Sequence, residues 1–479
     1  MSINRSIADL LRSHSTIPTS LSSTSPVEDT VAKTAAYSVV AGDNNKVILC
    51  SAASADYNIT LLAAATAGDG FSITIRKTDT TKYRITLVTN SSETISGLPD
   101  LRLVQPQASA TLISDGSNWH IIDHSSLAVE GNAVDNPCAQ VDQMDNAYAV
   151  RTNLGDAGNK YFIDRWKIDK STSPSARYTF SIQTQGGVDG RSRYYKMLCT
   201  SGDTFNATND CQSIKQHLLG HGKQNFMHHN GFFGGGVLSM DVMGHLDTPA
   251  APYTLAIGLH TYDGTGRQYV GNVTIDADAT WQRVYLVIPP DTTARLDSHN
   301  GNAGVIGIGL CAGDGRFATN NTWENCDAND LSTSSSQNWG HTANNYIAWT
   351  NVKFQPGQIA TPFVARTTAE ETEVARYYFQ RITGETVISW NVNIDTTTSG
   401  YLMGRLPFPM RATPTMSSTL DHANTLVSAN SYIMSSAGSP YIYDNEAFYQ
   451  GFVLSGATAG YGARVTVKGT NFLQWDANI

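Results

Sequence analysis

The stretch VKFQPGQIATPFVARTTAEETEVARYYFQR, residues 352–381, contains a change from one kind of secondary structure to another. Apolar and polar residues alternate at its start, which is typical of a strand with one buried face. Pro356-Gly357 and Pro362 then interrupt the alternation. The charged segment that follows predicts a helix over residues 369–381. The stretch therefore predicts the end of a β domain and one helix after it.

The predicted helix has a clear start signal. Thr367 and Glu370 have the T-x-x-E spacing of a capping box, and Glu371 adds negative charge where the helix dipole is positive. Its apolar residues recur at i, i+3 and i+4: Val374, Tyr377 and Tyr378. This stripe would pack against sandwiches of the same chain or, in a trimer, against two other helices about an axis. The sequence favours neither arrangement.

The chain reads as β structure on both sides of this helix. Runs with two-residue alternation, separated by turn signals, recur from Tyr37 to Asp123 and predict a small sandwich or barrel. Longer runs upstream of the helix, such as YTLAIGLHTYD, predict a jelly-roll sandwich of two antiparallel sheets. We therefore expect an all-β fold of several β-sandwich domains in series. The expected boundaries are 31–125, 131–366 and 367–479, the last including the helix.

Residues 1–30 predict a separate attachment segment. SINRSIADLLR forms a short amphipathic helix whose apolar face contains Ile3, Ile7, Leu10 and Leu11. Because so short a helix is marginal alone, it must dock on another surface. SHSTIPTSLSSTS follows and is typical of a flexible tether. A docking helix on a tether indicates a point of attachment to a larger assembly, although it would equally suit a helix that caps its own domain.

Composition narrows the class of protein. Charged residues make up 15% of the 479, while Ser, Thr, Asn and Gly are abundant, which is typical of β-rich extracellular, virion or carbohydrate-facing proteins. The net charge of −9 argues against nucleic acid and anionic membrane as partners. No apolar run approaches a membrane span, and we expect no secretory signal.

The six cysteines form no CxxC pair, so zinc-site spacing is absent. We expect buried thiols. The nearest pairs for any disulfide are Cys199 with Cys211 and Cys311 with Cys326.

Several of these stretches, taken in order, resemble the tail fibres of tailed bacteriophages and related virion proteins. The matching runs are YFIDRWKID (161–169), ATWQRVYLVIPPDTT (279–293), GQIATPF (357–363) and LPFPMRATPTMS (406–417). Residues 37–123 also resemble a small β module of phage fibres, and MSINRSIADLL resembles a virion-proximal end. The run LLGHGKQNFMHHNGFFGGG (218–236) departs from the pattern.

The resemblance implies a homotrimeric virion appendage with a carbohydrate-binding-like jelly roll and distal receptor-binding domains. Its N-terminus would attach to a phage adaptor, a portal-proximal tail protein or the capsid. The expected ligand is a host surface glycan or receptor.

Aromatic residues in and beside the longest loops are the candidates for glycan contact, because a flat ring suits the apolar face of a sugar. They are Trp323, Trp339, Tyr262 and Tyr346, with His341 nearby. Each ring could instead fill the base of its own loop. The last domain offers the same ambiguity at Trp390, Tyr401, Tyr441, Tyr443 and Tyr449.

Two clusters of side chains could support metal binding or glycoside hydrolysis. His217 and His221, at i and i+4, would share a helix face and could bind a divalent ion, but the cluster contains no acidic residue. Asp314, Glu324 and Asp327 lie in one loop, whereas a glycosidase needs two carboxylates held at a set separation. We expect no metal, no cofactor and no catalysis. A purely structural fibre and a polysaccharide depolymerase remain the alternatives to a receptor-binding fibre.

Overall fold

The computed structural model describes most of the chain, and all structural statements below refer to these residues. They are 29–81, 83–90, 92–98, 100–103, 107–125, 131–143, 151–154, 160–170, 175–188, 193–204, 210–220, 226–227, 231–262, 266–296, 301–326, 331–384, 389–396, 398–406, 408–418, 425–428, 433–442, 447–455, 462–467 and 469–476. The attachment residues Ile3, Ile7, Leu10 and Leu11 lie outside them. Among the helices described here, none has the length and apolar character needed to cross a membrane.

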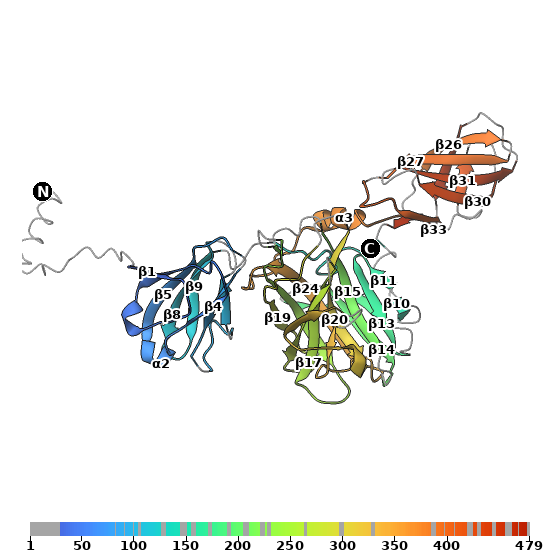
Figure 1. The fold of residues 1–479 in the computed structure, drawn as a ribbon. Helices are drawn as coiled ribbons and strands as arrows, with labels where there is room; N and C mark the ends of the chain where they lie inside the picture. Colours follow the sequence, from blue (N-terminus) through green and yellow to red (C-terminus); the bar gives the residue numbers. More distant parts are fainter. Residues whose placement is uncertain are drawn as a thin grey trace, which may run out of the picture. The chain divides into compact units, whose positions relative to one another are not determined.

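The chain divides into two compact units, residues 1–127 and 128–479, and each is considered by itself. Both are built almost entirely of strands (Figure 1), so the expected all-β fold of sandwich-like domains is confirmed. The finer expected division of the second unit at residue 366 stays a prediction.

The first unit has a five-stranded sheet, β1-β3-β5-β8-β9, and a four-stranded sheet, β2-β4-β6-β7. Its elements are β1 (Thr30–Lys33), β2 (Tyr37–Ser38), β3 (Lys46–Cys50), β4 (Tyr57–Thr60), α2 (Ala64–Ala67), β5 (Asp69–Lys77), β6 (Ile85–Val88), β7 (Asp100–Leu103), β8 (Ser109–Asp115) and β9 (Trp119–Ser125). Strands β1 to β6 alternate between the sheets, so β1, β3 and β5 pair in parallel, as do β2, β4 and β6. Alternation alone could not predict this, because parallel and antiparallel strands share the two-residue period.

The second unit begins with an antiparallel sandwich of one six-stranded and one seven-stranded sheet. The six-stranded sheet runs β10 (Arg151–Leu154), β13 (Arg177–Gln183), β14 (Tyr194–Ser201), β24 (Tyr346–Pro356), β16 (Gly236–His245) and β19 (Gln282–Ile288). The seven-stranded sheet runs β11 (Lys160–Ile163), β12 (Trp166–Lys170), β15 (Cys211–Leu219), β20 (Asn302–Ala312), β17 (Tyr253–Thr261), β18 (Arg267–Ile275) and β22 (Thr322–Asn325).

Aromatic side chains from both sheets form the core between them. Phe162 of the seven-stranded sheet lies 4.4 Å, between ring centroids, from Phe180 of the six-stranded sheet. Trp166 and Tyr195 make the same crossing at 6.0 Å, and Trp349 lies 5.2 Å from Tyr195. Truncating one such ring typically costs about 3–5 kcal/mol, so this contact positions both sheets firmly.

A loop covers part of the outer face of the seven-stranded sheet. It contains the short strands β21 (Phe317–Ala318) and β23 (Ser332–Thr333), and its Leu331 is buried. Leu331 approaches so closely that a Cβ on Gly307 would lie 2.6 Å from its Cδ1, and one on Gly309 would lie 2.2 Å from its backbone oxygen. Gly307 and Gly309 of β20 therefore allow the loop to pack this closely on the sheet.

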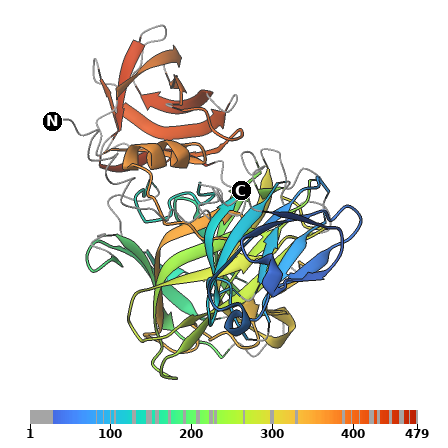
Figure 2. The same ribbon diagram turned by 90° about the vertical axis from the view of Figure 1, so that its left-hand side faces the viewer.

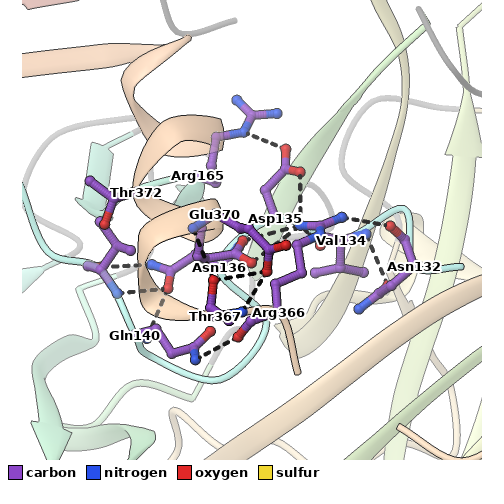
Figure 3. A network of polar contacts seen from close by, with 12 residues as sticks. Asn132, Val134, Asp135, Asn136, Gln140, Arg165, Arg366, Thr367, Glu370 and Thr372 are labelled. Carbon is purple, nitrogen blue, oxygen red and sulfur yellow. Dashed lines mark hydrogen bonds and ion pairs between the residues drawn. The ribbon is translucent and has the colours of Figure 1, made fainter. Parts of the chain in front are cut away.

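Helix α3 (Thr368–Arg376) docks on the sandwich of its own chain (Figures 2 and 3). The expected capping box is present, with Thr367 accepting from the Glu370 backbone N–H. Glu371 is fully buried and accepts hydrogen bonds from the Asn136 backbone and from Arg366, whose Nη1 lies 3.2 Å from Oε2. Burial raises the pKa of Glu371, while Arg366 and Asn136 act against that rise.

Two expectations about this helix were wrong. It ends at Arg376 rather than Arg381, because β25 (Phe379–Gly384) pairs with β33 (Gly469–Asp476) almost a hundred residues downstream. The helix buries Glu371 and Ala375, and the expected stripe is right only at Tyr378, which is buried just beyond the helix end, whereas Val374 and Tyr377 are half-buried. The guanidinium of Arg165 lies 3.4 Å from the ring centroid of Tyr378, which holds the end of the helix against the sandwich.

After the helix the chain forms two more sheets, one three-stranded (β25-β33-β28) and one six-stranded (β29-β32-β26-β27-β31-β30). The remaining strands are β26 (Ser389–Thr396), β27 (Ser399–Arg405), β28 (Thr415–Ser418), β29 (Thr425–Ser428), β30 (Ile433–Ile442), β31 (Ala447–Ser455) and β32 (Gly462–Val467). All six cysteines of the chain are present as thiols, and five are buried, as expected.

Candidate functional site

The outer face of the six-stranded sheet carries aromatic and polar side chains, of which Lys196, Trp281 and Tyr346 are half-buried and Tyr194 is 8% exposed. Alternation sets this arrangement, because Tyr195 and Met197 of β14 point into the core, so Tyr194 and Lys196 point outward. The same rule applies to Tyr346 of β24, which lies beside Ile347 of the core.

Tyr346 is the centre of one group on this face. It is the Cα partner of His245 on β16, and the two rings lie 5.4 Å apart. The Lys196 Nζ lies 3.9 Å from the centroid of the Tyr346 ring, within the range of a cation–π contact. Partial burial lowers the pKa of Lys196 and raises that of Tyr346.

A carboxylate joins this group. The His245 Nδ1 lies 2.9 Å from Asp278 Oδ1, and the Tyr253 hydroxyl donates to the same oxygen at 2.7 Å. Desolvation alone would raise the pKa of Asp278, but the hydrogen bonds from Tyr253 and His245 lower it instead. The carboxylate therefore stays ionised, and its side chain is 44% exposed, so it can accept hydrogen bonds from a ligand.

A second group lies around Trp281, which directly precedes β19. Its ring meets Tyr194 edge-on, with the centroids 5.0 Å apart. Its Nε1 donates to the Gly186 carbonyl at 3.0 Å, in the loop that follows β13. We call the two groups together the aromatic face, defined by Tyr194, Lys196, His245, Asp278, Trp281 and Tyr346.

Not every acid on this face is available to a ligand. Asp241, another acid on the outer side of the sheet, already accepts from Asn351 and lies 3.4 Å from the Arg283 guanidinium. It is therefore engaged in a structural contact. The face offers flat rings for stacking and a carboxylate, an imidazole and an ammonium for hydrogen bonds, which is the combination that recognises polyhydroxylated ligands.

The aromatic residues expected to act together do not meet. Tyr346 lies on the aromatic face, but the 42% exposed Tyr262 follows β17 on the opposite sheet. Trp339 is only 1% exposed and packs edge-on against Tyr253, so it is a core residue with no free ring face. Trp323 is half-buried, and its Nε1 donates to the Pro289 carbonyl at 2.8 Å. Both tryptophans fill their own loop bases.

The other expected residues lie apart from this face. His341 is exposed in the loop before β24, where its backbone packs against Gly202. His217 lies in strand β15, so the helix that would have paired it with His221 is wrong, and His221 is outside the described residues. Within the part of the chain that the structure describes, no three His, Cys, Asp or Glu side chains group as metal ligands would.

The acidic loop is only partly described. Asp314 lies in a short 3-10 helix at Asp314–Arg316 and is not buried, whereas Asp327 is outside the described residues. Glu324 on β22 accepts from Gln268 at 2.8 Å and from the Thr319 backbone at 2.9 Å. Its carboxylate therefore stabilises the loop.

Sequence reasoning missed most of the aromatic face. Tyr194 begins a strand and Trp281 directly precedes one, whereas the expected glycan contacts were aromatic residues in or beside the longest loops. The signal that could have found Tyr194 and Lys196 is the parity of positions along the strand, meaning that every second residue faces the same side. In YYKMLC, Met197 and Cys199 point inward, so Tyr194 and Lys196 point outward. Parity predicts outward residues, but not which sheet face remains uncovered.

Comparisons with known proteins give limited information. No protein-family model matches this chain, and no curated protein matches it. Among solved structures, it is similar to the enzymatically active domain of bacteriophage CBA120 tailspike protein 4, at 10% identity and a TM-score of 0.25, over 69% of this chain and only 38% of that domain.

Binding modules also appear among the similar structures. One is a family 11 carbohydrate-binding module of Clostridium thermocellum (13% identity, 43% of this chain, 97% of the module, TM-score 0.22). Another is the CBM22-1 xylan-binding domain of Paenibacillus barcinonensis (10% identity, 45% and 99%, TM-score 0.22). These TM-scores are too low to assign a fold or a function to this chain.

Proposed function

We propose that this protein is a non-enzymatic virion fibre of a tailed phage, anchored by its N-terminus, that binds a host-cell surface glycan through its β domains. The phage assignment is supported by the ordered sequence runs between residues 161 and 417 that resemble tail fibres. The glycan assignment is supported by the aromatic face.

The single observation that carries glycan binding is the group around Tyr346. A sugar ring stacked on an aromatic residue presents its hydroxyls at the ring edge, where Lys196 can donate and Asp278 can accept. His245 has a side chain 31% exposed and lies between Tyr346 and Asp278, so it can serve either role. Tyr346, Lys196 and His245 lie on strands, and Asp278 is held in the turn between β18 and β19 by His245 and Tyr253, which keeps the site rigid.

Such a shallow site binds weakly, with a Kd on the order of 1 mM, or about −4 kcal/mol. A homotrimer presents three such faces, and several fibres per particle multiply that number. Linked sites of this kind raise avidity by roughly a hundredfold or more without new contacts. Trimerisation therefore belongs to the proposal, and analytical ultracentrifugation of the full chain measures it directly.

Binding to surface polysaccharides from candidate bacterial hosts tests the proposal, with released reducing ends followed in the same samples. Tyr346→Ala and Trp281→Ala are compared with Tyr83→Ala, a half-buried tyrosine in the first unit. We expect retention of the parent protein, a loss of about tenfold or more in affinity for the two face variants, and no change in the control.

Other outcomes would overturn specific parts of the proposal. Equal retention of all variants would show that the glycan site does not lie on this face. New reducing ends would make the protein a depolymerase. Failure of the parent protein to bind any polysaccharide would leave a structural fibre.

A further inference from the structure

The outer face of the seven-stranded sheet carries a buried group of charged side chains that the proposed function does not use. Trp166 and Ile168 of β12, and Ile214 and Leu218 of β15, point into the core. Alternation therefore directs the residues between them outward. We call this group the cationic cluster, defined by Lys167, Asp169, Lys215, His217 and Tyr262.

The cluster is well enclosed for charged groups. Lys167 and Lys215 are Cα partners on adjacent strands, and they are 7% and 1% exposed. His217 is 8% exposed. Leu331 lies over Gly307, the β20 partner of Lys215, and bounds the cluster on that side. The 42% exposed ring of Tyr262 stacks on His217 with centroids 6.5 Å apart, so the cluster reaches solvent there.

Two cations near this face have carboxylate partners. The Lys215 Nζ lies 2.6 Å from Asp169 Oδ2. The Arg165 Nε lies 3.1 Å from Asp135 Oδ2, a contact that Figure 3 shows, and another guanidinium nitrogen donates to the His217 carbonyl. These charges are compensated within the described chain.

Lys167 is not compensated in the same way. Among the described residues its ammonium makes no hydrogen bond or ion pair, and its aromatic neighbour, Tyr161, has its ring centroid 5.9 Å away. Burial lowers the pKa of Lys167; Asp169 acts to raise it, and Lys215 and Arg165 lower it further. The residue is only 7% exposed, so its ammonium loses much of its hydration without gaining a hydrogen bond or ion pair from the described residues, and this is costly to the folded state.

His217 shares this lack of partners. Neither ring nitrogen meets a hydrogen-bond partner among the described residues, and the same holds for the Asn302 Oδ1 close by. Burial, and then Lys167, hold the pKa of His217 at about 3, although a contact with the Asn302 side chain acts in the other direction. The ring is therefore neutral at physiological pH and carries one N–H donor.

We propose that the cationic cluster is a second binding site, which takes the oxyanion of an acidic sugar, with Lys167 and His217 as its donors and the Tyr262 ring as a flat wall for the sugar. A carboxylate placed there supplies the negative charge that Lys167 lacks and an acceptor for the His217 N–H. The source of the anion as a glycan rests on the proposed function, whereas the oxyanion site itself does not.

Calorimetry and thermal unfolding of the full chain test this site in a buffer free of oxyanions. The probes are sodium glucuronate, glucose as its neutral analogue and sodium phosphate as a free oxyanion. The variants are Lys167→Met and His217→Gln. Lys33→Met is the matched control, because Lys33 is also a lysine beside a tyrosine, with its Nζ 3.5 Å from the Tyr37 ring centroid, but it lies in the first unit and outside both proposed sites.

We expect glucuronate to bind and to raise the unfolding temperature, as any ligand specific for the folded state does. Lys167→Met weakens this binding by about tenfold or more, since a charge-assisted hydrogen bond is lost. His217→Gln weakens it less, and Lys33→Met leaves it unchanged. Glucose does not bind there. Phosphate competing as well as glucuronate would also support an oxyanion site, with a free anion as its source.

Unfolding without ligand gives an independent readout. Lys167→Met should raise the unfolding temperature in anion-free buffer, because it removes an uncompensated charge. A lower temperature would show that Lys167 already has a partner within the chain and would overturn the site. Loss of glucuronate binding in Tyr346→Ala, with Lys167→Met unaffected, would also overturn it, while leaving the proposed aromatic face intact.

Discussion

The two outer faces of one sandwich differ in how their charges are handled. On the six-stranded sheet, Asp278 and His245 pair with each other and remain 44% and 31% exposed. On the seven-stranded sheet, Lys215 and Asp169 pair while only 1% and 9% exposed, and Lys167 beside them is buried without a carboxylate partner of its own among the described residues.

This difference follows from what covers each face. Leu331 and its loop lie over the seven-stranded sheet and exclude water from its outward polar residues. Tyr346 and its neighbours remain in contact with solvent. The same two-residue alternation thus produces a wet region on one face, around Tyr346, and a dry region on the other, around Lys215, because desolvation makes each charge depend on its partner.

The largest expected effect separates the two faces by stability. Asp169→Asn removes the carboxylate partner of the buried Lys215 ammonium and should cost about 3–5 kcal/mol of unfolding free energy. Asp241→Asn, on the aromatic side, removes a contact with the partly exposed Arg283 and should cost about 1–2 kcal/mol. Urea denaturation measures both. Equal losses would show that the faces are desolvated alike.

The next prediction concerns pH. Because the folded-state pKa of His217 is about 3, against an ordinary value near 6.5, the unfolded chain binds more protons between these values. Stability from this group is therefore complete above pH 6.5 and falls as the pH is lowered towards 3.

Between pH 7 and pH 4, the parent protein should therefore lose on the order of 3 kcal/mol more unfolding free energy than His217→Gln. Urea midpoints recorded from pH 7 to pH 4 test this, with His245→Gln on the wet face as the control. A parallel pH profile for parent and His217→Gln would contradict the burial of a neutral ring.

A smaller effect is expected where neither face is touched. Thr367→Ala removes the side-chain cap of α3 and should cost about 1 kcal/mol. Thr367→Ser, which can keep the cap, is the matched control. The unfolding temperature of the second unit measures the loss, and binding at both faces should be unchanged. Altered binding would mean that α3 is coupled to a site.

The smallest expected effect is at Tyr285, which lies on the outward side of β19 and is 52% exposed. Tyr285→Ala should change stability by about 0.5 kcal/mol or less, since little surface is buried there. The buried Tyr178 is the contrast, where the same change should cost about 3–5 kcal/mol. A large loss at Tyr285 would show that the six-stranded sheet is covered too.

Local signals predicted the elements that depend on local chemistry. The capping box at Thr367 begins α3 as expected, because its donors and acceptors lie three residues apart. The strand runs of the sandwich were predicted as well. The end of the helix was not, because Phe379–Gly384 becomes a strand through pairing with residues 469–476, and no local signal carries that partner.

The candidate site was predicted only in part. Trp339 and Tyr346 stand seven residues apart among similar polar neighbours, yet one is a core residue and the other lies on the surface. The deciding feature is Gly244 on β16, where a Cβ would lie 2.6 Å from the Trp339 ring. Only the folded sheet brings the space above Gly244 and the ring of Trp339 together.

By itself, the sequence determined an all-β fold, the start of the helix at Thr367 and the alternation of inward and outward residues along the strands. These depend on spacing along the chain and on backbone geometry that every residue carries with it. The tertiary structure decided which outward face stays wet, which rings are exposed and which lysine is buried without a partner of its own. Those depend on what other segments cover, and exclusion of water by distant parts of the chain sets the energy of every charge.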